Sequence, residues 1–134
     1  MLKRMLTVTC LVVLWTNVVF AEANWELIGS KDFYSDYYKI TFHNQYFIDN
    51  DSIKNMQVGM NDVIKAKIKV SNQKPEEYSI DQYWVNSDTK QWKLAFTEKY
   101  IDNTLHSQND YRNQDWNTYD PNDMVINEIL KRAN

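Results

Sequence analysis

The sequence is poor in the residues that build disulfide frameworks, metal clusters and phosphate-binding loops. Its 134 residues include one Cys, two Gly, two Pro and two His. One Cys excludes an internal disulfide framework and a multi-cysteine zinc or iron–sulfur site. Two Gly exclude a glycine-rich phosphate loop, and two His cannot by themselves form a three-histidine metal centre. We therefore expect a fold that depends on its hydrophobic core alone.

The composition is that of one globular domain. Hydrophobic residues make up 43% of the chain and charged residues 25%, which is too apolar for a disordered protein. The length also fits a single domain. A net charge of -3 argues against a broad nucleic-acid-binding face. We therefore expect no nucleic-acid partner.

The N-terminus has the pattern of a secretory signal peptide. Two basic residues precede an apolar run over residues 5–20, which is shorter than the roughly 20 residues that span a bilayer. Small residues at Ala21 and Ala23 fit the positions that a signal peptidase requires. We therefore place the cleavage between Ala23 and Asn24. Cleavage after Ala21 and an uncleaved membrane anchor are the alternatives.

Cleavage at this site defines two parts of the chain, a signal peptide (1–23) and a mature domain (24–134). The signal peptide contains Cys10, so the mature domain enters an oxidising compartment without a thiol. We expect the domain to be secreted, periplasmic or on the cell surface. It then has no membrane span after cleavage.

The mature sequence predicts antiparallel strands. The clearest is Val63–Val70, in which apolar residues alternate with Lys65, Lys67 and Lys69, so the three ammonium groups should share one face. Further strands are predicted over 25–28, 37–42, 45–48, 78–85 and 91–101 and more weakly near Leu105, with a turn at His43-Asn44. In 91–101, alternation places Trp92, Leu94 and Phe96 on one face and Lys93, Thr97 and Lys99 on the other.

A capping pattern predicts one helix at the C-terminus, after a loop over 107–119. Asp120 fits the N-cap, Pro121 the first helical position and Asp123 the positive end of the helix dipole. One apolar stripe follows at helical spacing, formed by Val125, Ile126, Ile129, Leu130 and Ala133. The expected fold class is α+β. It consists of a single antiparallel β-sheet of about five to six strands in meander-like order, packed by the C-terminal α-helix.

Residues that could carry chemistry are few and isolated. His43 and His106 have no catalytic motif around them, which favours ordinary surface positions. Asp49-Asn50-Asp51 resembles the start of a calcium loop, but Lys54 replaces the required glycine. Four acids could gather a cation if their loop folds back, although a solvated loop and a helix cap explain them: Asp110, Asp115, Asp120 and Asp123. We therefore predict no catalytic residue, no cofactor and no metal.

Two features suggest binding instead. The lysine row of Val63–Val70 could meet an anionic polymer, although such rows more often form a solvent face or blunt edge pairing. Aromatic residues make up 14% of the chain, and all but Trp15 and Phe20 lie in the mature domain. Exposed aromatic strips bind sugars, haem or proteins, whereas buried ones fill a core. Both interpretations of the aromatics stay open at this point.

Several landmarks occur in order along the mature domain, namely 25–28 (Trp-Glu-Leu-Ile), 46–49 (Tyr-Phe-Ile-Asp), 51–53 (Asp-Ser-Ile), 90–94 (Lys-Gln-Trp-Lys-Leu), Trp116 and Pro121. In this order and spacing the chain resembles the surface-adhesin protein E-like family of small secreted bacterial domains. The resemblance implies an antiparallel sheet with helical packing, displayed outside the cytoplasm. The family's named member is an adhesin that binds host matrix and serum proteins and haem.

The chain also departs from this pattern. Relatives often carry one Cys in the middle strand region and another near the end of the last helix. The corresponding stretches here, around Trp84-Val85 and Lys131-Arg132, contain none, so the helix should be held by packing alone. The named adhesin is a lipoprotein, whereas no lipidation site is visible here.

We expect a non-enzymatic binding module, adhesin-like, with a protein or haem as its ligand. The alternatives are an accessory or structural subunit of an envelope assembly and, less favoured, a small extracytoplasmic hydrolase that uses His43 or His106. Clustering of both His with an Asp and a Ser would favour the hydrolase. A flat exposed aromatic or lysine face would favour binding, and a large apolar patch would favour the subunit.

Overall fold

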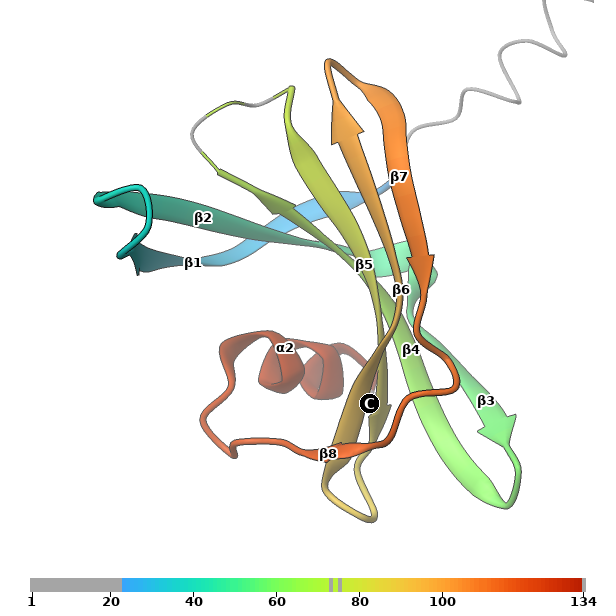
Figure 1. The fold of residues 1–134 in the computed structure, drawn as a ribbon. Helices are drawn as coiled ribbons and strands as arrows, with labels where there is room; N and C mark the ends of the chain where they lie inside the picture. Colours follow the sequence, from blue (N-terminus) through green and yellow to red (C-terminus); the bar gives the residue numbers. More distant parts are fainter. Residues whose placement is uncertain (1–22, 73, 75, 134) are drawn as a thin grey trace, which may run out of the picture.

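One strongly curled antiparallel sheet and a C-terminal helix make up the fold (Figure 1). The computed structural model describes residues 23–72, 74 and 76–133, and the statements below concern these residues. The predicted signal peptide up to residue 22, including Cys10, lies outside them. The strands are β1 (Trp25–Ser35), β2 (Ile40–Asp49), β3 (Lys54–Val58), β4 (Asn61–Ser71), β5 (Tyr78–Asn86), β6 (Gln91–Ile101), β7 (Thr104–Asp110) and β8 (Asn117–Thr118). The helices are the 3-10 turn η1 (Asn50–Ser52) and α2 (Met124–Ala133).

The strand order is β1-β2-β4-β5-β6-β7, which confirms an antiparallel, meander-like sheet with a C-terminal helix. The predicted five to six strands were too few, because the sheet has eight. The two additional strands, β3 and β8, each pair with only part of a longer strand. β3 pairs with the first half of β4, and β8 pairs with the start of β6. β8 is only two residues long, too short to give a periodic signal.

Residues 49–52 carry the chain from β2 to β3 along the same edge of β4. The Asp49 carboxylate accepts the Asp51 backbone N–H at 3.1 Å and thereby caps η1. The Ser52 hydroxyl donates to the Asp49 carbonyl at 2.7 Å and accepts the Lys67 N–H at 2.8 Å. Ser52 therefore supplies a hydrogen bond where neither β2 nor β3 pairs with β4. The acidic residues of this segment thus belong to a structural turn, in which Asp49 caps η1, and not to a calcium loop.

β1 and β2 form a long hairpin, and its turn is not where the sequence predicted it. His43 lies in the middle of β2 and pairs with Asp32 of β1. The turn instead spans residues 36–39, with Lys39 at a φ of 56°. Ser35 fixes it, because its carbonyl accepts the Lys39 N–H at 2.8 Å and its hydroxyl accepts the Tyr38 N–H at 3.2 Å. His43-Asn44 was therefore a wrong turn prediction.

The alternation predicted for β4 is confirmed. Ala66 and Ile68 are fully buried under α2, with Ile64 and Val70 packed against the same core. The core consists of Ile48, Ala66, Ile68, Val85, Tyr119, Val125, Ile126 and Ile129. We call this side of the sheet the helix face and the opposite side, which carries the β4 lysines, the open face.

Alternation fails in β6, because a bulge lies where the pairing passes from Gln82–Phe96 to Tyr83–Leu94. On the C-terminal side of the bulge, each β6 residue lies on the face opposite to the one that simple alternation predicts. Phe96 therefore lies on the open face, and Thr97 lies on the helix face opposite Asp81. The predicted loop over 107–119 is also wrong in part, since β7 continues to Asp110.

The helix begins at Met124, and its N-cap is Asp123 rather than Asp120. Asp123 Oδ1 accepts the Ile126 N–H at 2.9 Å. Asp120 instead accepts the Asn122 N–H at 2.8 Å in the preceding turn. The predicted stripe is confirmed, because Val125, Ile126 and Ile129 are buried and Leu130 packs against the core. No helix among the described residues is long and apolar enough to cross a bilayer.

Packing alone does not hold the helix, contrary to the prediction. Arg132 in its last turn pairs with Glu26 of β1 at 3.0 Å and with Glu128 one turn earlier. Its Nε also donates to Asn50 Oδ1 at 3.2 Å, and Asn50 donates to Glu26 at 2.8 Å. This polar cluster connects α2 to β1 and η1.

Candidate binding surfaces

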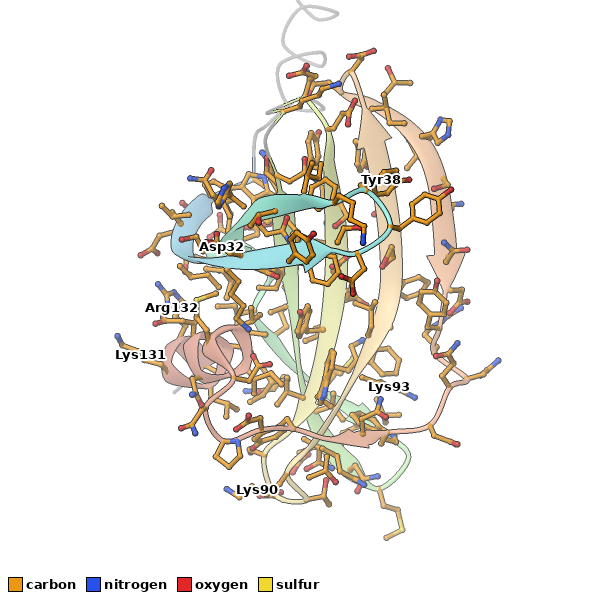
Figure 2. All side chains as sticks on the ribbon, turned by 60° about the vertical axis from the view of Figure 1, so that its left-hand side comes forward. Asp32, Tyr38, Lys90, Lys93, Lys131 and Arg132 are labelled. Atoms are coloured by element: carbon orange, nitrogen blue, oxygen red, sulfur yellow. The ribbon has the colours of Figure 1, made fainter. Side chains whose placement is uncertain are left out.

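The end of the β1–β2 hairpin exposes a group of aromatic and aliphatic side chains that we call the hairpin tip. Its members are Phe33, Tyr34, Tyr37, Tyr38 and Ile40. Tyr37 keeps 87% and Tyr38 65% of the accessible surface of an isolated residue. Figure 2 shows Tyr38 projecting from the turn, away from α2. Such a concentration of exposed rings on one projecting element points to an interaction surface.

The hairpin tip is ordered by its own contacts. The Tyr37 and Tyr38 rings meet edge to face, with centroids 4.8 Å apart, and Tyr38 meets Phe42 in the same way at 6.3 Å. The Ser35 hydrogen bonds fix the backbone beneath them. Because tyrosine has few rotatable bonds and a polar hydroxyl, these rings can cover a partner at small entropic cost.

The lysine row lies on the open face as predicted, but its members differ in their surroundings. The Lys69 ammonium lies over three rings, 4.6 Å from the centroid of Tyr78, 5.6 Å from Phe47 and 6.0 Å from Trp25. Lys67 is exposed, and Lys65 is half-buried. The three lysines therefore do not form a uniform strip for an anionic polymer.

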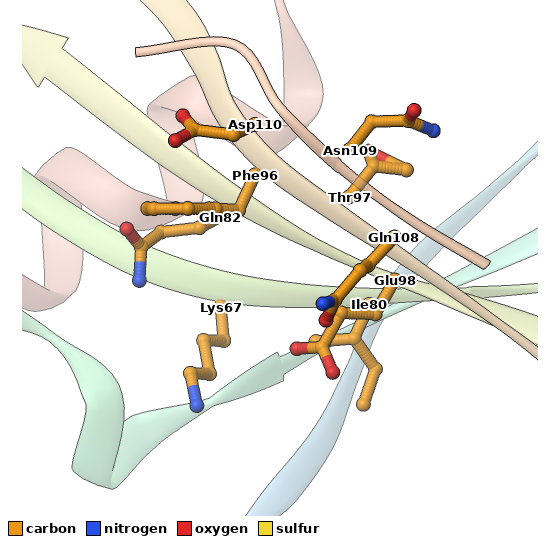
Figure 3. A pocket seen from close by; sticks show the side chains of 9 residues that line it. All are labelled: Lys67, Ile80, Gln82, Phe96, Thr97, Glu98, Gln108, Asn109 and Asp110. Carbon is orange, nitrogen blue, oxygen red and sulfur yellow. The ribbon is translucent and has the colours of Figure 1, made fainter. Parts of the chain in front are cut away.

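A hollow of about 490 Å³ lies beside Lys67 on the open face, and we call it the β4–β7 hollow (Figure 3). Ile80 and Phe96 contribute its apolar part. The polar residues that line it are Lys67, Gln82, Thr97, Glu98, Gln108, Asn109 and Asp110. Its size lies within the range of ~300–1,000 Å³ that is usual for small-molecule sites.

Neighbouring side chains hold two polar groups of this hollow, Gln82 and Glu98, in place. The Trp84 indole N–H donates to Gln82 Oε1 at 3.1 Å, and the Tyr100 hydroxyl donates to Glu98 Oε2 at 3.0 Å. Partial burial and the Glu98 carboxylate raise the pKa of Tyr100, which keeps that hydroxyl a donor.

Asp110 closes one end of the hollow in a fixed, charged state. Arg112 donates to both of its carboxylate oxygens, and these hydrogen bonds hold the pKa of Asp110 below its usual value. The guanidinium of Arg112 also lies 4.7 Å from the centroid of the Phe96 ring. The end of the hollow is therefore held by an ion pair that rests on an aromatic ring.

Lys93, predicted on the face opposite Trp92 and Leu94, is a buried cation with a structural role. Only 6% of it is exposed, because it lies between the rings of Trp84 (5.2 Å) and Trp116 (4.7 Å). Its ammonium donates to the carbonyls of Arg112 at 2.6 Å and Gln114 at 3.2 Å. Lys93 thereby attaches the loop between β7 and β8 to the sheet.

The two histidines do not come together. His43 Nδ1 lies 2.6 Å from Asp32 Oδ1 on the exposed hairpin, whereas His106 lies on β7 at the other edge of the sheet. Ser30 and Ser71 line the same hollow of about 500 Å³ as His43, but in the described part of the chain neither donates to its ring. The arrangement is a histidine–carboxylate pair without a nucleophile in contact.

Most of the other predicted residues have structural partners. Asp110 pairs with Arg112, Asp120 and Asp123 cap turns at the helix start, and Asp115 lies exposed between β7 and β8. The residues that the structure describes contain no group of three or more His, Cys, Asp or Glu that could hold a metal. At the predicted cleavage site, Asn24 follows Ala23 directly before β1, and its N–H donates to Asp49 at 3.3 Å.

Sequence reasoning missed both surfaces for different reasons. The tyrosines of the hairpin tip were visible, but a wrongly placed turn put Tyr37 and Tyr38 inside a strand. The residues of the β4–β7 hollow come from four strands and form no motif. Only the cross-strand register brings Lys67, Gln82 and Phe96 into one row.

The comparisons with known proteins leave the family open. No protein-family model matches the chain, and neither the curated proteins nor the solved structures provide a match. The resemblance to the surface-adhesin protein E-like family therefore stays a prediction.

Proposed function

We propose that the mature domain is a secreted or periplasmic, non-enzymatic binding module, adhesin-like, that recognises a partner protein through its hairpin tip. The observation that carries this proposal is the exposure of Tyr37 and Tyr38 on an ordered turn. Tyrosine is enriched in the residues that contribute most to protein–protein binding. A projecting turn presents these rings to a partner without rearranging the sheet.

Two arguments favour this function over the alternatives. A hydrolase would need a nucleophile beside His43, and within the described residues the nearby serines do not donate a hydrogen bond to its ring. An envelope-assembly subunit would be expected to expose a broad apolar patch, whereas the exposed apolar groups here concentrate at the end of one hairpin. The matrix and serum ligands implied by the family resemblance fit the same kind of surface.

The proposal can be tested with purified, immobilised extracellular-matrix and serum proteins. Binding of the mature domain is compared with that of a Tyr37→Ser/Tyr38→Ser variant by surface plasmon resonance. We expect at least one protein of the panel to bind and the double variant to bind it at least about tenfold more weakly. Haem is titrated in parallel by absorbance, because the resemblance implies it as another ligand.

Met60→Ser is the matched control, because Met60 is a fully exposed apolar residue in the turn between β3 and β4. It should bind like the unmodified domain. A panel without any binding protein would argue against an adhesin-like function. Unchanged binding by the double variant would place recognition away from the hairpin tip.

A further inference from the structure

The β4–β7 hollow presents donors and acceptors side by side. Lys67 can only donate, and the free carboxylate oxygen of Glu98 can only accept. The amide of Gln108 can do both, and Gln82 keeps its NH2 group because Trp84 occupies its carbonyl oxygen. In Figure 3 these polar ends lie around the side chains of Ile80 and Phe96.

The charges of the hollow balance one another. Lys67 is one positive charge and Glu98 one negative charge, while Asp110 is already neutralised by Arg112. Glu98 would repel an anionic ligand, and Lys67 would repel a cationic one. A neutral ligand whose groups both donate and accept hydrogen bonds avoids both penalties.

The apolar part of the hollow narrows the ligand class further. Ile80 and one side of Phe96 lie among the polar groups, and Arg112 rests on the Phe96 ring. A pyranose ring has an apolar C–H surface surrounded by hydroxyl groups, each of which both donates and accepts. This matches a hollow with an apolar part and a mixed polar rim.

We propose that the β4–β7 hollow binds a neutral saccharide. Gln82, Glu98 and Gln108 contact its hydroxyl groups, and Lys67 donates from the β4 side. Trp84 already holds Gln82 and Tyr100 already holds Glu98, so these two side chains gain little order on binding. This site is separate from the hairpin tip and does not depend on the function proposed for it.

The test uses the mature domain labelled with ¹⁵N and a panel of methyl glycosides of glucose, galactose, mannose and N-acetylglucosamine. We expect at least one of them to shift the side-chain NH2 resonances of Gln82 and Gln108 in NMR spectra. Gln82→Leu and Gln108→Leu should each weaken that binding about fivefold to tenfold, which corresponds to one lost hydrogen bond. Glucuronate and glucosamine, as charged probes, should bind more weakly than the neutral glycoside.

Gln45→Leu is the matched control, because Gln45 lies on the open face of β2 and lines the separate hollow beside His43. It should bind the sugar like the unmodified domain, as should the Tyr37→Ser/Tyr38→Ser variant. No shift of the two glutamine side chains with any glycoside would overturn the proposal. Tighter binding of glucuronate or glucosamine would replace it with an ionic site.

Discussion

At the residue scale, the least expected feature is the number of ionisable groups with structural roles. Lys93 is buried between two tryptophans, Lys69 lies among three aromatic rings, and Asp81 is half-buried on the helix face. The partners of the two lysines compensate for their desolvation, whereas the hydrogen bonds from Thr97 and Ser79 offset only part of that of Asp81. In the described part of the chain no buried side-chain nitrogen or oxygen lacks a hydrogen bond.

The first prediction concerns Lys93. Replacing it by Met keeps the length of the side chain but leaves the carbonyls of Arg112 and Gln114 without their donor. We expect Lys93→Met to lower the free energy of unfolding by about 1–3 kcal/mol and to loosen the loop that carries Trp116. Urea denaturation measures the first effect and tryptophan fluorescence the second.

Lys99→Met on the same strand provides the control, since Lys99 is exposed and should tolerate the change. If both variants unfold at the same urea concentration, Lys93 does not hold the loop.

The second prediction concerns the pH dependence that Asp81 contributes. Burial raises the pKa of its carboxyl, opposed by hydrogen bonds from Thr97 and Ser79. A raised carboxyl pKa means that the folded state binds the proton more tightly than the unfolded state. The charged form of Asp81 therefore destabilises the fold at neutral pH, and this penalty disappears as the pH falls through its pKa.

Asp81→Asn should accordingly raise the free energy of unfolding at pH 7, and the gain should shrink on acidification. Urea denaturation of both proteins at a series of pH values checks this. Glu26 and Asp110, whose pKa values are lowered by Asn50 and Arg112 respectively, destabilise both proteins equally in acid, so they cancel in the difference. A gain that persists unchanged in acid would show that Asp81 is not the titrating group.

At the element scale, the register of the sheet and the start of the helix are set by short polar segments. Ser35 fixes the hairpin turn, Ser52 bridges β2 and β4, and Asp123 caps α2. Each of these side chains satisfies a backbone group that would otherwise lack a partner. The elements themselves form where apolar residues have the right period.

The third prediction tests which aspartate caps the helix. Asp123→Ala removes the acceptor for the Ile126 N–H and should cost about 0.5–2 kcal/mol of unfolding free energy. Asp120→Ala removes only the bond to the Asn122 N–H in the exposed turn and should cost less. Thermal or urea denaturation ranks the two variants. The reverse order would return the cap to Asp120, as the sequence pattern first indicated.

At the scale of the whole molecule, the curled sheet has a helix face that forms the core and an open face on which the proposed saccharide site lies. The hairpin tip lies at one end of this sheet, and the β4–β7 hollow lies toward the opposite edge. The two surfaces share no residue and can therefore act independently. The predicted start of the mature chain, Asn24, lies directly before β1, and its N–H contacts Asp49.

The fourth prediction concerns that start. Cleavage between Ala23 and Asn24 would turn the Asn24 N–H, 3.3 Å from Asp49 Oδ1, into an ammonium group beside a nearly buried carboxylate. A charge-assisted hydrogen bond is stronger than a neutral one. We therefore expect a domain beginning at Asn24 to be about 1 kcal/mol more stable than one that retains Ala23.

Intact-mass measurement of the secreted protein locates the cleavage, and urea denaturation compares the two forms. The mature domain should also unfold identically with and without reductant, because its sequence contains no Cys. A mass that includes the first residues would contradict the predicted signal peptide. Equal stability of the two forms would show that the Asn24 ammonium does not stabilise the fold through Asp49.

The sequence by itself determined the elements whose signals are local. The alternation in Val63–Val70 predicted β4 and its faces, and the stripe around Ile126 and Ile129 predicted a helix that packs on the sheet. These patterns are reliable because a side chain's direction follows directly from the period of its own strand or helix. The absence of cysteine in the mature domain likewise required a core without disulfides.

Only the tertiary structure decided which groups meet across strands. The bulge in β6 moved Phe96 to the open face, and two tryptophans with two carbonyls made a buried site for Lys93. The hairpin turn was set by hydrogen bonds of Ser35 rather than by the turn propensity of His43-Asn44. The β4–β7 hollow combines residues as distant as Lys67 and Gln108, whose neighbourhood depends on the pairing of four strands. Register is a property of pairs of strands, so no single segment of the sequence contains it.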